Sequence, residues 1–200
     1  MISHYILNIC NILTQIVIFL IFLKVINMAV LKIAQMGSEI LKNRAQEITN
    51  FDEFEINRLF EDMVETMVDS NGIGLAAPQV FFPLRVVIFF VPESRNNGKE
   101  VPLTKMINPI IRPKSESMDE DWESCLSVPG LAGIVPRWRN ITYSYQDLDG
   151  SLRERDASGY HARVVQHECD HLDGILYPMR MVDLSTLSFV EAISDEKEEN

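Results

Sequence analysis

The segment His167–His171, which reads HECDH, constrains this chain more than any other. Residues four apart lie on one face of an α-helix, with Cβ atoms about 5–6 Å apart, so the two histidines can reach one metal ion. The H-E-x-x-H pattern is typical of zinc hydrolases, in which the glutamate is the general base. The alternative is a pair of surface histidines beside a solvated glutamate. We expect a helix over Gly159–Leu172, ended by Asp173-Gly174.

A catalytic metal site needs three protein ligands and one open position. In zinc proteases the third ligand is usually a downstream His or Glu, but no His follows His171, and the first downstream Glu is Glu191. Cys125 is a better candidate, because a thiolate beside two imidazoles suits iron(II), zinc, nickel or cobalt rather than calcium or magnesium. Cys169 lies between the two histidines and points away from their shared face, so we expect it to fill space.

The composition restricts the class of protein. The 200 residues fit one domain with a substantial core, and 46% of them are hydrophobic, which argues against a disordered chain. The net charge of −11 argues against an extended phosphate-binding surface, so we expect no direct DNA binding. Three cysteines without regular spacing indicate reduced thiols and a cytoplasmic location rather than a disulfide framework.

The first 27 residues differ from the rest of the chain. Residues 5–23 are mostly apolar, but they reach the length of a membrane span, about 20 residues, only by including polar side chains. A membrane anchor, an apolar tail, and translated sequence upstream of a true start at Met28 all remain open, and membrane contact is expected only if residues 5–27 are expressed. We therefore divide the chain into this extension, 1–27, a catalytic domain, 28–183, and a short helix with an acidic tail, 184–200.

Hydrophobic periodicity predicts the elements of the domain. Apolar residues recur at helical spacing from Ile56 to Val68, in a helix capped by Asn50 or Asp52 and ended by Asn71-Gly72. The other expected elements are an edge strand at 30–35, strands at 84–91, 105–112, 141–145 and 151–155, a charged loop at 114–121, and a helix at 185–193. The expected fold class is α+β, with antiparallel strands packed around a central helix that carries the metal-binding motif, and a short C-terminal helix.

Three separated segments resemble the motifs of the peptide deformylase family, in the family's order. GIGLAAPQ at 72–79 is similar to G-x-G-x-A-A-x-Q, ESCLS at 123–127 to E-G-C-L-S, and QHECDH at 166–171 to Q-H-E-x-D-H. The resemblance covers roughly residues 28–177. Ser124 stands where the family has glycine, which can provide a backbone angle or a close approach that a side chain hinders. We expect this serine to retune the site rather than inactivate it.

The resemblance implies one divalent metal ion, usually Fe²⁺ in the cell, with Zn²⁺, Ni²⁺ or Co²⁺ as substitutes. Its ligands would be Cys125, His167 and His171, with water in the fourth position. The reaction would remove the formyl group from the initiator formyl-methionine of nascent polypeptides and release formate. Metal-bound hydroxide would attack the formyl carbon, and Glu168 would take the proton and later give it to the leaving amine.

The resemblance also implies roles for the other motif residues. The side-chain amide of Gln79 and the backbone N–H of Leu126 would stabilise the oxyanion. Ile73, Gly74 and Leu126 would line the substrate approach and accept a methionine side chain. The expected substrates are N-formyl-methionyl nascent peptides, with transient association with the ribosome, and we expect a monomer.

Three charged residues are expected to support the site from outside the ligand set. Glu123 and Asp170 would orient the cysteine loop and the metal-binding helix through Arg137, although a purely structural ion pair remains open for Glu123 and Arg137. Arg163 is expected to be a solvated or structural charge. Two other readings stay open: a zinc endopeptidase of the H-E-x-x-H type, and a structural zinc site with Cys169 as a fourth ligand.

Overall fold

The computed structural model describes residues 29–50 and 52–193. The predicted extension, 1–27, and the acidic tail, 195–200, lie outside the described residues. The elements, in chain order, are η1 (Glu39–Lys42), α2 (Glu53–Asp69), β1 (Gly74–Ala76), η2 (Ala77–Val80), β2 (Val86–Val91), η3 (Glu93–Arg95), β3 (Val101–Pro113), β4 (Met118–Cys125), β5 (Val128–Trp138), β6 (Asn140–Gln146), β7 (Leu152–Ser158), α3 (Gly159–Leu172), η4 (Tyr177–Met179), η5 (Leu184–Thr186) and β8 (Ser188–Phe189).

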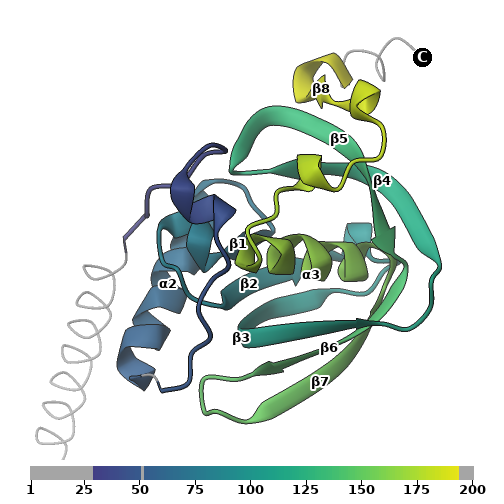
Figure 1. The fold of residues 1–200 in the computed structure, drawn as a ribbon. Coiled ribbons are helices and arrows are strands. Elements are labelled where there is room, and N and C mark those ends of the chain that lie inside the picture. The colour runs from purple at the N-terminus through teal and green to yellow at the C-terminus, as the bar shows by residue number, and fades with distance from the viewer. Residues whose placement is uncertain (1–28, 51, 194–200) are drawn as a thin grey trace, which may run out of the picture.

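Two antiparallel sheets surround one helix. The first sheet has the strand order β1-β2-β3-β6-β7, and the second has the order β4-β5-β8. Figure 1 shows α3 in the middle of the molecule, between the two sheets, with α2 at one side. This arrangement confirms the predicted α+β fold, in which antiparallel strands pack around the helix that carries the metal-binding motif.

The burial of α3 explains how its polar residues can form a site. The apolar side chains Ala162, Val165 and Leu172 belong to a core cluster that includes Phe89 and Tyr143 of the five-stranded sheet. Nearly every residue from His161 to Leu172 is buried, the charged ones included. Buried polar groups are normally hydrogen-bonded, so a buried polar atom of α3 that lacks a partner marks a candidate functional position.

The predicted first helix is confirmed as α2. Its N-cap is Asp52, whose carboxylate accepts a hydrogen bond from the backbone N–H of Phe54 at 2.8 Å. The helix ends before Asn71, which has a positive φ of 54°. The backbone N–H of Gly72 then donates a hydrogen bond to the carbonyl of Met67. The chain next enters β1, on the edge of the first sheet.

The predicted strands at 84–91, 105–112, 141–145 and 151–155 are confirmed, because they overlap β2, β3, β6 and β7, although β2 and β7 begin one or two residues later than expected. A hairpin at Asp149-Gly150 joins β6 to β7, as expected from the turn signal. Asn108 has a φ of 50°, and a register shift between Ile107 and Ile110 interrupts β3 next to Pro109. These features match the predicted interruption of this strand.

Three sequence expectations were wrong or incomplete. Residues 30–35 are not a strand, because Ala34 and Met36 donate to the carbonyls of Gln79 and Ser127, which belong to different segments and form no ladder. The expected charged loop at 114–121 contains the start of β4, which pairs with the unpredicted strand β5. Of the C-terminal helix expected at 185–193, the described residues show helix at 190–193, because the residues before it form η5 and β8.

Among the described residues, we find no helix that is both long and apolar enough to cross a membrane.

Candidate metal centre

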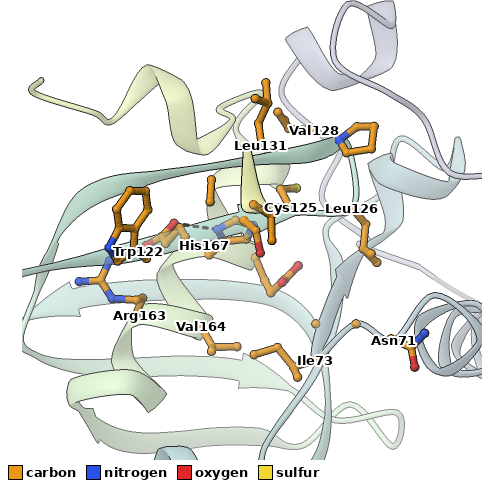
Figure 2. A pocket seen from close by; sticks show the side chains of 18 of the residues that line it. Asn71, Ile73, Trp122, Cys125, Leu126, Val128, Leu131, Arg163, Val164 and His167 are labelled. Carbon is orange, nitrogen blue, oxygen red and sulfur yellow. Dashed lines mark hydrogen bonds and ion pairs between the residues drawn. The ribbon is translucent and has the colours of Figure 1, made fainter. Parts of the chain in front are cut away.

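The second sheet brings Cys125 to the two histidines of α3. Cys125 ends β4, where the register with β5 shifts between Ser124 and Cys125. Its sulfur lies 3.4 Å from Nε2 of His171, and the ligand atoms of Cys125, His167 and His171 all lie within 4.8 Å of one another. Figure 2 shows Cys125 beside His167. The structure therefore brings together all three residues expected to bind a metal.

Glu123 fixes the orientation of His167. Its carboxylate lies 2.8 Å from Nδ1 of His167, so Nδ1 donates and Nε2 is left as the lone-pair nitrogen. Arg137 donates twice to the same carboxylate, each time at 2.9 Å, and Arg163 donates at 2.7 Å. Burial alone would raise the pKa of Glu123, but the hydrogen bonds from Arg137 and His167 hold it well below its usual range. Glu123 is therefore an anion that stabilises a specific histidine tautomer.

The chemistry of the donor set fits a metal ion. Burial would raise the pKa of the Cys125 thiol, but the neighbouring His171 and His167 outweigh it and bring this pKa well below its ordinary value. The sulfur also accepts hydrogen bonds from the Ser127 backbone N–H at 3.4 Å and from Nε2 of Gln79 at 3.6 Å. A thiolate and two imidazoles are the ligands expected for a divalent transition metal.

Glu168 lies beside this group, in a space that only glycine leaves open. The residue is 5% exposed, and its Oε2 has no hydrogen-bond partner among the described residues. Burial raises the pKa of this carboxyl to about 7. A Cβ atom on Gly74 would lie 2.6 Å from Cδ of Glu168, so a side chain at position 74 would collide with the carboxyl group. Position 74 in β1 must therefore be glycine, because its backbone lies close to the Glu168 carboxyl group.

Gln79 is held so that its amide nitrogen faces the site. Its Oε1 accepts a hydrogen bond from the Ala76 backbone N–H at 2.8 Å, which leaves Nε2 to donate toward Cys125 and to Ser127 Oγ, the latter at 3.1 Å. Ser127 was not singled out from the sequence, although it is the last residue of the second motif. Leu126 lies between Cys125 and Ser127 in the sequence. Its side chain is partly buried and packs against the core cluster that contains α2.

A cavity of about 650 Å³ opens onto this centre. Ile73, Gly74 and Leu126, expected to line the substrate approach, all border it. Figure 2 shows Ile73 and Val164 on one side of His167 and Leu131 on the other. Lining residues that sequence reasoning did not identify come from separate parts of the chain: Arg95, Trp122, Tyr160, Val190 and Ile193. No local pattern marks them, since only the fold brings them together.

Asp170 and Arg137 belong to the hydrogen-bond network that surrounds Glu123. Arg137 bonds Asp170 as well as Glu123, and so links β4 to α3. Arg180 donates to both carboxylate oxygens of Asp170, at 3.1 and 2.7 Å. Arg163 is not solvated, because it is 4% exposed and bonds Glu123 and the Val135 carbonyl, which makes it a structural charge.

Two other expectations concern Cys169 and Ser124. Cys169 is 6% exposed and packs in the apolar core cluster, outside the metal-ligand group, as expected for a residue that fills space. Ser124 is exposed at the edge of the cavity, pairs with Ala132 and has no positive φ. The serine therefore needs no backbone angle that only glycine allows.

A thiolate and two imidazoles that converge beside a buried carboxylate, at the base of a cavity, define a metal-dependent hydrolase. Comparisons with known proteins narrow this class. Residues 30–186 match the family described as polypeptide deformylase. The chain is 45% identical to peptide deformylase 1 of Nitrosomonas europaea, over 80% of this chain and 93% of that protein. It is 47% identical to peptide deformylase 1 of Bordetella pertussis, over 84% of this chain and 97% of that protein.

Comparison with solved structures points to the same family. A class I type b peptide deformylase from Acinetobacter baumannii with bound Met-Ala-Ser matches with a TM-score of 0.72 and 38% identity, over 76% of this chain and 99% of that one. The chain belongs to the polypeptide deformylase family. It is an enzyme that acts on formylated nascent peptides, and the zinc endopeptidase alternative is not favoured.

Proposed function

We propose that Cys125, His167 and His171 hold one divalent metal ion, Fe²⁺ in the cell, and that the enzyme releases formate from the formyl-methionine of nascent chains. The convergence of these three ligand atoms within 4.8 Å carries the proposal. Zn²⁺, Ni²⁺ and Co²⁺ are compatible with the same donors. When bound, the ion would act as a Lewis acid that polarises the formyl carbonyl and lowers the pKa of a water molecule.

Glu168 is the proton carrier in this proposal. Its pKa of about 7 lets the carboxylate accept a proton from water near neutral pH, and lets the acid return that proton to the nitrogen of the leaving amine. The free Oε2 supports this role, because no described residue occupies it. The proton therefore moves between water and the amine through one buried oxygen.

Gln79 and the backbone N–H of Leu126 stabilise the developing oxyanion. The Gln79 amide cannot rotate freely, since its oxygen is bonded to the Ala76 N–H. Its nitrogen is thus oriented before the substrate arrives, and a donor fixed in advance is worth about 10²–10³ in rate. Leu126 also borders the cavity, so the same residue lies against the bound peptide.

Ile73, Gly74 and Leu126 receive the methionine of the substrate. Ile73 is an apolar wall, and the missing side chain of Gly74 lets a peptide backbone approach Glu168. Glu123, Arg137 and Asp170 do not touch the substrate in this scheme. They hold His167 and α3 in place through the hydrogen bonds described above.

We further propose that the enzyme works as a monomer in the cytoplasm, with transient contact with the ribosome. The support is chemical, because the substrates are nascent chains and the thiol of Cys125 must stay reduced to bind metal. A catalytic domain at 28–183 remains part of this proposal.

The test is formate release from formyl-Met-Ala-Ser by protein purified without oxygen, with metal analysis of the same sample. We expect stoichiometric formate and about one metal ion per chain. Metal-loaded protein that releases no formate but cleaves internal bonds of unformylated peptides would instead favour an endopeptidase.

A further inference from the structure

The cavity has one wall that comes from the C-terminal end of the described chain. Val190 and Ile193 line it together with Cys125, His167 and Glu168. Both residues lie beyond position 186, where the match to the deformylase family ends. This wall therefore lies outside the part of the chain that the family model covers.

Backbone pairing holds this segment at the cavity. In β8, Phe189 pairs with Leu131 and Ser188 pairs with Ala132, both on β5. The turn before it is closed by Asp183, whose carboxylate accepts from the Ser185 N–H at 2.8 Å. Figure 1 shows β8 beside β5, above α3. Because Val190 follows the paired residue directly, its place at the cavity is fixed by the sheet.

The wall presents apolar surface on the side of the cavity that carries Leu131. Val190 is 41% exposed and Ile193 is half-buried, while Leu131 packs against a separate core cluster of the second sheet. Figure 2 places Leu131 across His167 from Ile73. Because β8 pairs with β5 at Leu131, the C-terminal wall lies across the reacting centre from Ile73, one of the residues proposed to receive methionine.

We propose that Val190 and Ile193 form an apolar subsite that selects peptides by the side chain at the second or third residue, downstream of formyl-methionine. The inference rests on the proposed function and assigns part of its substrate preference. An apolar side chain that reaches this wall leaves water, whereas a polar one loses hydration without gaining a partner. The subsite therefore favours leucine over alanine at the second residue, or leucine over serine at the third.

The test compares kcat/KM for formyl-Met-Leu-Ser, formyl-Met-Ala-Leu and formyl-Met-Ala-Ser. A chain that ends after Ile193 keeps the wall, and one that ends after Phe189 removes it while keeping β8. In the full chain, Val190→Ala trims the wall, and Val182→Ala is the matched control, because Val182 is 82% exposed and does not line the cavity.

We expect at least one leucine peptide to be preferred in the full chain. Removal of residues 190–200 should lower that preference about four- to fifteenfold, the effect of one or two buried methylene groups. Val190→Ala should lower it in the same direction, while Val182→Ala and the chain ending after Ile193 leave it unchanged. Isothermal titration with the products Met-Leu-Ser, Met-Ala-Leu and Met-Ala-Ser should show the same change in Kd ratio without turnover.

The proposal would be overturned if the ratio of kcat/KM for the leucine peptides to that for formyl-Met-Ala-Ser were the same in the full chain, both shortened chains and both alanine variants. A full chain that releases no formate from any of the peptides would instead refute the proposed function. The two failures are distinguishable, because the first leaves formyl-Met-Ala-Ser turnover intact.

Discussion

Glu123 and His167 are joined by a hydrogen bond of 2.8 Å that links the end of β4 to the middle of α3. The bond connects the motif that contains the cysteine to the motif that contains the histidines. Arg137 and Arg163 hold the carboxylate from two further directions, so Glu123 has little freedom to move. The geometry of the metal centre thus depends on a residue that is not itself a ligand.

Replacing this carboxylate should weaken metal binding. In Glu123→Gln the neutral amide no longer compensates the two arginines or holds the histidine tautomer, so metal affinity should fall about 10- to 100-fold. Competition with a chelator, followed by metal analysis of folded protein, measures the change. Glu120→Gln, on the exposed part of the same strand, is the control and should bind metal normally. Unchanged affinity in Glu123→Gln would show that the hydrogen bond is dispensable.

The two described cysteines should respond differently to the same substitution. Cys125→Ala removes a proposed ligand, so the protein should lose its metal on dialysis and its formate release with it. Cys169→Ala removes a small buried group from the core and should retain metal, with only a modest loss of thermal stability. Metal content and thermal unfolding of both variants check this. Metal loss in Cys169→Ala alone would reverse the assignment.

Two neighbouring glycines provide a matched test of close approach. Gly74→Ala places a Cβ 2.6 Å from the carboxyl carbon of Glu168, so Glu168 must move, and kcat should fall at least tenfold. In Gly72→Ala the nearest atom is the tip of the Leu126 side chain, at 2.9 Å, which can rotate away. Its activity should stay within a few-fold of the original. Steady-state kinetics on formyl-Met-Ala-Ser decide the outcome, and equal effects of the two variants would contradict this account.

Glu168→Gln should separate metal binding from catalysis. The amide has nearly the shape of the carboxyl group but cannot accept and return a proton, so kcat should fall about 10²–10⁴-fold. Metal content should stay the same, because Glu168 is outside the ligand group. Full turnover by this variant would remove Glu168 from the mechanism.

Local sequence signals predicted the parts of this protein that depend on neighbours along the chain. The spacing of His167 and His171 defined a helix, and the capping signal of Asp52 defined the start of another. β5 was not predicted, because Pro129, Gly130, Gly133 and Pro136 hide its alternation, and its partner β4 is strongly charged. Its pairing with β4 is a tertiary feature that no local pattern reports.

The site shows the same division between local and long-range information. The proposed ligands and the catalytic candidates lie in motifs that can be recognised in the sequence. The sequence left open whether Arg163 is solvated or structural, because its partners, Glu123 and the Val135 carbonyl, are 28 or more positions away in the chain. Val190 and Ile193 reach the cavity only through the β5–β8 pairing. A charge or a cavity wall that depends on distant segments leaves no trace in local composition.

The buried His161 should make the protein less stable in mild acid. It lies 3.1 Å from the Tyr143 hydroxyl and against Phe89, and burial, with a smaller effect of Arg155, lowers the pKa of His161 from 6.5 to about 4. As pH falls from about 6.5 to 4, the unfolded chain binds a proton here that the folded chain does not. The free energy of unfolding must therefore decrease as the pH falls across this window. Below about pH 4, His161 causes no further change.

The contribution of His161 can be isolated from that of other histidines by a difference measurement. His161→Gln keeps a polar group opposite the Tyr143 hydroxyl but does not titrate. Urea unfolding at pH 7.5 and at pH 5 should show a smaller loss of stability in this variant than in the original protein. The metal-centre histidines are present in both proteins, so their effect cancels in the comparison. Equal losses in the two would mean that His161 is protonated as easily in the folded chain as in the unfolded one.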